Sequence, residues 1–230
     1  MKEKTQPKTQ SITITPLNFK CLEMTIIGTA PYMQARFGAK AMQAMRAKQE
    51  AGSTARKGTK REARDFAEDF KQAIHVSSDG WVGIPAPAVR NAMIRACAIV
   101  GFKMTQAKMS VFCESDGLDA VDGSPLVKLD AGDPEQSEMT VRNATGVVDI
   151  RVRPMWREWQ ARVRIRFDAD QFTPADVYNL LMRAGEQVGI GEGRPFSKDS
   201  AGLGFGTFTV DPENVVCRDL SAPPPVHIDG

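Results

Sequence analysis

The chain has few of the residues that build zinc sites or disulfide frameworks. No two of its four cysteines form a CxxC pair, and its only histidines are His75 and His227. Zinc sites and disulfide frameworks need closely spaced ligands or regular cysteine patterns. We therefore expect no metal, no cofactor and reduced, mostly buried thiols. Two histidines also give too little to assign a Ser-His-Asp or Cys-His catalytic arrangement.

Long apolar runs are absent as well. No run approaches the ~18 residues of a membrane-spanning helix, and the first residues, Met1–Gln6, lack the apolar centre of a signal peptide. These absences predict a cytoplasmic protein without a membrane partner. A hydrophobic content of 42% in 230 residues is enough to build one sizeable core.

The net charge of +2 indicates nothing about partners, but its distribution is uneven. Between Arg36 and Arg64, nine Lys and Arg residues stand against two acids, a local charge of +7. Between Glu114 and Glu138 the one basic residue among the acids is Lys128. We expect one basic surface and one acidic insertion, the alternative being an ordinary solvated surface. The basic residues expected to contact phosphates are Arg36, Lys40, Arg56, Lys57, Lys60 and Arg61.

Six glycines fall between Gly189 and Gly206, around Arg194 and Lys198. The segment is neither a P-loop nor a dinucleotide-binding turn, because an alternating strand pattern follows it and a helix precedes it. A glycine-rich loop with two cations can present amides and positive charge to a phosphate chain. The alternative is an ordinary flexible connection.

Hydrophobic periodicity predicts the remaining elements. The expected strands are 17–29, 108–113, 148–153, 161–167 and 206–210, and the expected helices are 86–100 and one that begins with the Thr173–Asp176 cap. Residues 31–71 read as a mostly helical basic insertion, and 114–140 as an acidic loop.

Strict alternation in residues 147–167 predicts an antiparallel hairpin with one arginine face. The arginines on that face are Arg151, Arg153, Arg162, Arg164 and Arg166. We expect them to point away from the helices, where they bind a ligand or pair with acids on a neighbouring strand. Trp156 and Phe196 are candidates for stacking on bases, although the tryptophans fit a buried position as well.

The order of elements is β-α-β-β-α-β, which predicts an α+β, ferredoxin-like (RRM-like) core with a basic helical insertion and an acidic loop insertion. The expected layout is a flexible arm at 1–15, one domain at 16–212 with insertions at about 32–75 and 114–145, and a tail at 213–230.

Three segments make the sequence similar to the RAMP superfamily, the CRISPR-associated RNA-binding proteins, and above all to its effector backbone subunits. The segments are Gly28–Pro31, Gly83–Arg90, and Gly189–Gly191 with Gly202–Gly206. A stand-alone relative from a phage or other mobile element fits the resemblance as well as a CRISPR subunit does.

The resemblance implies that the glycine-rich loop and the segment after the first strand lie against an RNA backbone. It implicates Arg194, Lys198, Arg36 and the amides near Gly191 and Gly204. Family members that process RNA often use a histidine, which makes His75 a weak catalytic candidate. A lone histidine between Ile74 and Val76 is more often structural.

The favoured hypothesis is a non-catalytic protein that binds single-stranded RNA, or DNA, and forms a head-to-tail homo-oligomer along the strand. One alternative is a structural or assembly protein, such as a phage component, that oligomerises without nucleic acid. A second alternative is an RNA-processing endoribonuclease.

Overall fold

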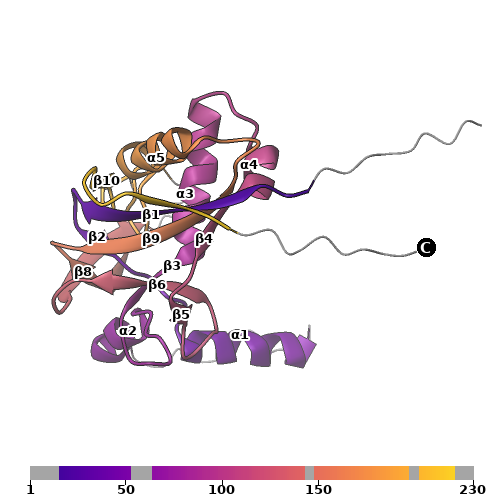
Figure 1. The fold of residues 1–230 in the computed structure, drawn as a ribbon. Coiled ribbons are helices and arrows are strands. Elements are labelled where there is room, and N and C mark those ends of the chain that lie inside the picture. Colours follow the sequence, from indigo (N-terminus) through magenta and orange to yellow (C-terminus); the bar gives the residue numbers. More distant parts are fainter. Residues whose placement is uncertain (1–15, 53–63, 143–147, 197–201, 221–230) are drawn as a thin grey trace, which may run out of the picture.

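The computed structural model describes residues 16–52, 64–142, 148–196 and 202–220, which form an α+β fold with mostly antiparallel sheets (Figure 1). The strands are β1 (Phe19–Gly28), β2 (Tyr32–Met33), β3 (Gly83–Pro85), β4 (Val111–Glu114), β5 (Gly117–Leu118), β6 (Pro125–Asp130), β7 (Glu135–Arg142), β8 (Val148–Trp156), β9 (Gln160–Asp168), β10 (Phe208–Val210) and β11 (Val216–Asp219). The helices are α1 (Ala39–Ala51), α2 (Phe66–Gln72), α3 (Ala86–Ile99), α4 (Met104–Ser110) and α5 (Pro174–Arg183), which continues into a π-helical turn, Ala184–Val188. Within these described ranges, no helix has the length and apolar character needed to cross a membrane.

Two long strands, β1 and β9, form the centre of the larger sheet. They pair antiparallel from Phe19 opposite Asp168 to Ile27 opposite Gln160. The outer edge of β1 pairs with β10 and β11, and the outer edge of β9 pairs with β4 and β6. One line across the sheet therefore reads β10-β1-β9-β4, with every pair of neighbours antiparallel. A smaller sheet has the order β2-β8-β7.

One face of the larger sheet is covered by α3 and α5 (Figure 1). Alternation along β9 places Val163, Ile165 and Phe167 in the core beneath these helices, each fully buried. Burying one such side chain contributes about 1.5–3 kcal/mol relative to leaving it exposed. A register shift by one residue would expose the whole set, so this face fixes the pairing of the strands.

The helix signals in the sequence are confirmed. Thr173 forms a capping box with Asp176, and Pro174 occupies the first turn of α5. Hydrogen bonds from the Thr173 hydroxyl and N–H lower the pKa of the Asp176 carboxyl. The helix expected over 86–100 is α3, and helical α1 and α2 occupy described parts of the basic segment.

Residues 108–113 are a strand only in part. The chain is helical as α4 up to Ser110, and β4 begins at Val111. Ala107 and Ser110 are buried in that helix, and the Arg90 guanidinium holds the junction by donating to Val111 O over 2.8 Å. Tertiary packing thus shortens the strand that periodicity predicts.

The hairpin predicted over 147–167 is wrong in its pairing, although both strands exist. β8 pairs with β7 and β2 in the smaller sheet, while β9 pairs with β1. Each strand is anchored by its own buried tryptophan: the Trp156 indole N–H donates to Gly132 O over 3.0 Å, and that of Trp159 donates to Ala30 O over 2.9 Å. The residues between them carry the chain from one sheet to the other.

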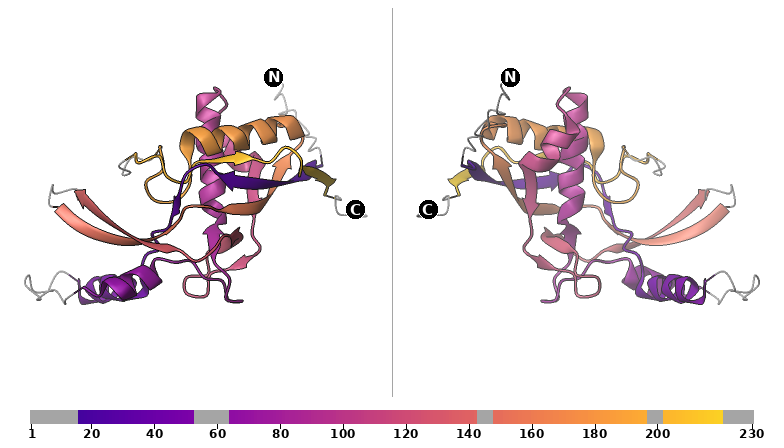
Figure 2. Two further views of the ribbon diagram at one scale, coloured as in Figure 1. Left: turned by 90° about the vertical axis from the view of Figure 1, so that its left-hand side faces the viewer. Right: turned by 90° about the vertical axis from the view of Figure 1, so that its right-hand side faces the viewer.

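The acidic segment is not a loop. It contains β5, β6 and β7, and β7 forms a long hairpin with β8 from Glu135 opposite Met155 to Arg142 opposite Val148. In Figure 2 this hairpin projects from the body of the molecule on the same side as α1. The acidic insertion therefore helps to build a protruding arm.

Candidate nucleic-acid interface

The glycine-rich segment packs back on the chain that leaves β1. The Ile190 N–H donates to Gly206 O over 2.9 Å, and the Gly206 N–H donates to Pro31 O over 2.7 Å. A third bond runs from the Glu192 N–H to Met33 O over 2.9 Å. Segments far apart in the sequence are thus joined main chain to main chain, which glycine permits because it has no Cβ. We call this contact the glycine clasp.

Two glycines of the clasp have no room for a side chain. A Cβ on Gly191 would lie 2.4 Å from Met33 O, and one on Gly206 would lie 1.8 Å from Ile190 O. Their φ angles are 78° and 65°, in the region that favours glycine. Gly204 also has a positive φ, 77°, but a Cβ there would meet no atom of the described residues within 4 Å. Of the two glycines predicted to face a ligand, Gly191 therefore faces this chain's own carbonyl, and Gly204 has no close neighbour among the described residues.

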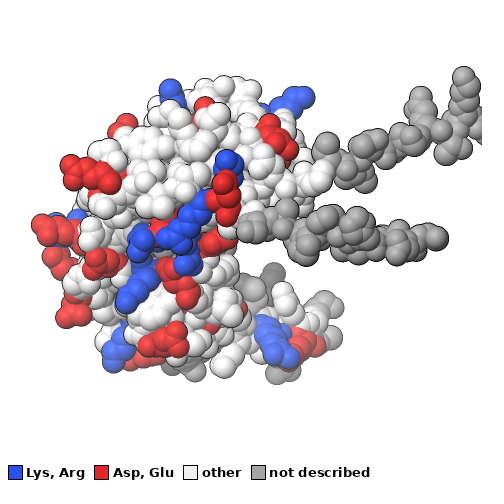
Figure 3. Space-filling model, in the orientation of Figure 1, with Lys and Arg blue, Asp and Glu red and all other residues white. Residues whose placement is uncertain are grey.

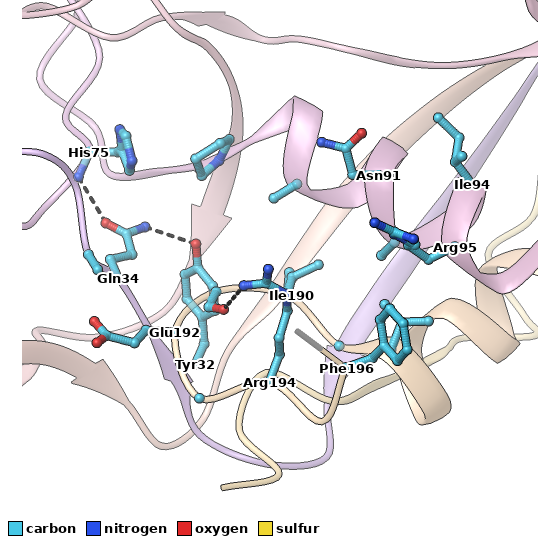
Figure 4. Close-up of a pocket in the computed structure, with 18 of the residues that line it drawn as sticks. Tyr32, Gln34, His75, Asn91, Ile94, Arg95, Ile190, Glu192, Arg194 and Phe196 are labelled. Carbon is cyan, nitrogen blue, oxygen red and sulfur yellow. Dashed lines mark hydrogen bonds between the residues drawn. The ribbon is translucent and has the colours of Figure 1, made fainter. Parts of the chain in front are cut away.

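A buried glutamine joins the clasp to the start of α3. The Gln34 Nε2 donates to Gly83 O over 2.7 Å, and its Oε1 accepts from the His75 N–H over 2.8 Å. The Tyr32 hydroxyl lies 3.3 Å from the same Nε2 (Figure 4). Burial raises the pKa of Tyr32, so its hydroxyl is neutral at all ordinary pH values.

A groove of about 850 Å³ lies between the glycine clasp and α3. Its walls come from the segment after β1, from α3 and from the glycine-rich loop. In Figure 4, Gln34 and Glu192 lie toward one end, while Arg95 and Phe196 lie at the other. Of the segments expected to lie near RNA, Gly83–Arg90 contributes Pro85 and Ala88 to the lining, and the glycine-rich loop contributes Gly189–Gly191.

Of the residues that the structure describes, three with cationic side chains line the groove: Arg95, Lys108 and Arg194. The Arg194 guanidinium donates to Gly191 O over 2.8 Å. The Arg95 guanidinium lies 5.6 Å from the centre of the Phe196 ring, and that ring is 53% exposed. An exposed aromatic ring beside cations suits a phosphate chain with stacking bases.

Among the described residues that line the groove, the one carboxylate is that of Glu192. It is held by two arginines of β8: Arg151 lies 3.2 Å from its Oε1, and Arg153 lies 2.6 Å from its Oε2. Two positive charges thus offset one negative charge, and the groove has an excess of positive charge. Both arginines point toward the glycine-rich loop rather than into a shared face with β9.

His75 and Arg36 converge on one buried acid. The His75 Nδ1 lies 2.9 Å from Asp119 Oδ2, and the Arg36 guanidinium lies 3.3 Å from Oδ1. Burial raises the pKa of Asp119, but hydrogen bonds from the Val121 N–H and His75 outweigh it and leave the pKa below its ordinary value. The Arg36 side chain is only 8% exposed. Its charge is therefore used inside the protein and does not face a bound strand.

The same acid belongs to a group that could offer ligands to a metal. His75, Asp119 and Asp122 each have a ligand atom within 4.8 Å of the others. The Arg36 guanidinium and the N–H groups of Val121 and Asp122 already donate to Asp119 Oδ1, and His75 Nδ1 contacts Oδ2. A second cation at this place would be repelled, so the cluster is best explained as structural.

The arginines of β9 lie on the face opposite the helices, as their alternation predicts, but each meets an acid on a neighbouring segment. The pairs are Arg162 with Glu23, Arg164 with Asp116 at 2.9 Å, and Arg166 with Glu114 at 3.9 Å. On the face seen in Figure 3, cationic and acidic side chains are interleaved. This face offers far less unbalanced charge than its arginine content indicates.

The remaining candidates are placed as follows. Trp156 is 2% exposed, so it cannot stack on a base. Lys40 lies on α1. The others lie outside the described residues: Arg56, Lys57, Lys60, Arg61 and Lys198.

Sequence reasoning missed Arg95, Lys108 and Glu192. Arg95 follows Asn91 by four residues on the polar side of α3, opposite the buried stripe, so helical spacing could have indicated that they share a face. Nothing in the local sequence of Lys108 or Glu192 indicates a groove, because their neighbours there come from distant segments.

No protein-family model matches this chain, and a search of characterised proteins also finds no match.

Proposed function

We propose that this protein is a non-catalytic module that binds single-stranded nucleic acid, RNA in preference to DNA, along the groove beside the glycine clasp. The observation that carries the proposal is the charge of this groove: three cations line it, and its carboxylate is already paired with two arginines. A strand of phosphates gains salt-dependent affinity from such a surface without any base-specific contact.

The topology supports a ferredoxin-like core. The line β10-β1-β9-β4 has chain order fourth, first, third, second among the core strands, all antiparallel, and α3 and α5 cover one face. This is the order expected for a β-α-β-β-α-β unit. The preference for RNA rests on the resemblance to the RAMP superfamily; two of the similar segments, Gly83–Arg90 and Gly189–Gly191, contribute residues to the groove lining.

The proposed site differs from the one that the sequence favours most. The β9 arginines are paired with acids, whereas Arg95 and Lys108 form no ion pair with an acidic residue in the part of the chain that the structure describes. Phe196 replaces Trp156 as the stacking residue, because Phe196 is half-exposed at the end of the groove. We therefore assign the strand to the groove and not to the open face of the sheet.

Assembly along the strand is part of the proposal. The β7–β8 hairpin and α1 project on one side of the body (Figure 2), and both carry exposed apolar side chains, among them Met42, Met45 and Ile150. Such side chains suit contact with a neighbouring copy in a head-to-tail array. The same observation favours the second candidate function, a structural protein that assembles without nucleic acid.

RNA cleavage is the third candidate. It is favoured by His75, which lines the groove and contacts the buried Asp119, since a carboxylate can orient an imidazole for proton transfer. Incubation with labelled RNA distinguishes it: cleavage that His75→Ala abolishes would replace binding by catalysis as the function.

The test of binding is a salt titration with a labelled single strand. We expect affinity to fall steeply with salt, and Arg95→Ala to reduce the log–log slope by about 0.7 per lost phosphate contact. The matched control is Arg162→Ala, which removes an arginine from the sheet face. Equal effects of the two variants, or no binding of any strand at low salt, would contradict the groove assignment.

A further inference from the structure

Glu192 occupies an unusual position in the groove. It stands between Gly191 and Gly193, and its carboxylate receives a guanidinium on each oxygen, from Arg151 at 3.2 Å and Arg153 at 2.6 Å. All three side chains are partly exposed, at 18% for Glu192, 37% for Arg151 and 20% for Arg153. The ion pair is therefore within reach of solvent and of a ligand.

The two arginines are positioned by the strand that carries them. Residues two apart on β8 point to the same face, so their guanidinium groups converge on one place. A guanidinium binds carboxylate and phosphate oxygens with the same planar geometry. A phosphodiester, like a carboxylate, offers two oxygens that share one negative charge. The position that the Glu192 carboxylate occupies between the two guanidinium groups thus fits a phosphodiester.

The Glu192 side chain can move away from the two arginines without unfolding the glycine clasp. Its main-chain N–H is bonded to Met33 O, so the backbone is anchored while the side chain alone rotates. The pair is partly exposed, so water can hydrate the carboxylate when it leaves the arginines, and an incoming phosphate replaces it as their partner. A phosphate chain that displaces the carboxylate also releases counterions, which favours the exchange.

We propose that Arg151 and Arg153 form a phosphate subsite at the end of the groove, which the Glu192 carboxylate occupies until a phosphodiester of the bound strand displaces it. This inference rests on the proposed function. It assigns to β8 a direct part in binding, and it makes Glu192 an internal competitor that lowers the affinity.

The test is Glu192→Gln, which keeps the shape of the side chain and removes its charge. We expect single strands to bind about fivefold more tightly at moderate salt, with a log–log salt slope steeper by about 0.7. Adding Arg153→Ala to this variant should cancel the gain. The matched control is Glu135→Gln, which frees Arg157 from an exposed pair outside the groove and should change neither quantity.

The outcomes separate this inference from the proposed function. If the parent protein binds single strands and Glu192→Gln does not increase the affinity, the subsite is refuted and binding in the groove stands. If no form binds a strand, the proposed function fails, and inorganic tripolyphosphate decides the subsite: it should raise the unfolding temperature of Glu192→Gln more than that of the parent or of Glu135→Gln. Equal shifts in all three, or an equal gain in affinity for a polyglutamate peptide, would overturn the assignment to phosphate.

Discussion

Gly206 is the position where a single methyl group tests the glycine clasp. In the native structure its N–H donates to Pro31 O and its carbonyl accepts from the Ile190 N–H. A Cβ at this position would lie 1.8 Å from Ile190 O, which belongs to the main chain and cannot rotate away. Gly206→Ala must therefore separate the two segments that the clasp joins.

The loss of unfolding free energy caused by Gly206→Ala follows from a comparison with Gly204→Ala. Both glycines have positive φ, 65° at Gly206 and 77° at Gly204, so alanine costs about 1–2 kcal/mol of backbone strain at either one. At Gly204 no atom of the described part of the chain lies within 4 Å of the added Cβ. At Gly206 the clash also disrupts two hydrogen bonds, each with a net contribution of about 0.5–1.5 kcal/mol. The difference between the variants should be about 2 kcal/mol.

Thermal unfolding measures this difference. For a chain of this size, ~2 kcal/mol corresponds to a midpoint about 4–8 °C lower for Gly206→Ala than for Gly204→Ala. Urea unfolding with an unchanged m-value would verify that the native state alone is affected. Equal midpoints for the two variants would show that the clasp does not hold these segments together, and the reasoning would be refuted.

Three further predictions concern stability and thiol chemistry. Thr173→Ala removes the capping box of α5 and should lower the free energy of unfolding by about 1 kcal/mol in urea titrations, whereas Thr173→Ser should not. The pKa of Asp119 is lower in the folded protein, so its contribution to stability is complete above the unfolded pKa of about 3.9 and is lost as the pH falls through the folded value. Asp119→Asn should therefore reduce the loss of unfolding free energy at acid pH. An unchanged pH dependence of stability would contradict this. Burial raises the pKa of Cys113 to about 12, while Cys217 is exposed, so a thiol reagent at neutral pH should modify Cys217 rapidly and Cys217→Ser should remove the fast phase.

The local elements could be predicted because their causes are local. The Thr173 cap indicates a helix start, and the alternation of Val163, Ile165 and Phe167 indicates a strand, each within a few residues. The pairing of β8 could not be predicted, since a short connection after Trp156 usually joins hairpin partners and only the separate burial of Trp156 and Trp159 directs the strands to different sheets.

The candidate site was predictable in part for the same reason. Glycine spacing indicated that main chains approach closely, but not whether Gly191 meets a ligand or Met33 O. The arginine stripe of β9 was visible in the sequence, whereas its acids, such as Glu23, come from a strand far away along the chain. Charge that is balanced by distant residues cannot be recognised from a local count.

Photo-crosslinking tests the central claim most directly. A single strand carrying 4-thiouridine would be irradiated with the parent protein, and the modified peptides would be mapped by mass spectrometry. Binding in the groove predicts crosslinks at Phe196 and on α3 near Arg95, which Arg95→Ala should reduce. Crosslinks on β9 around Arg164 and on β4, with none in the groove, would contradict the account.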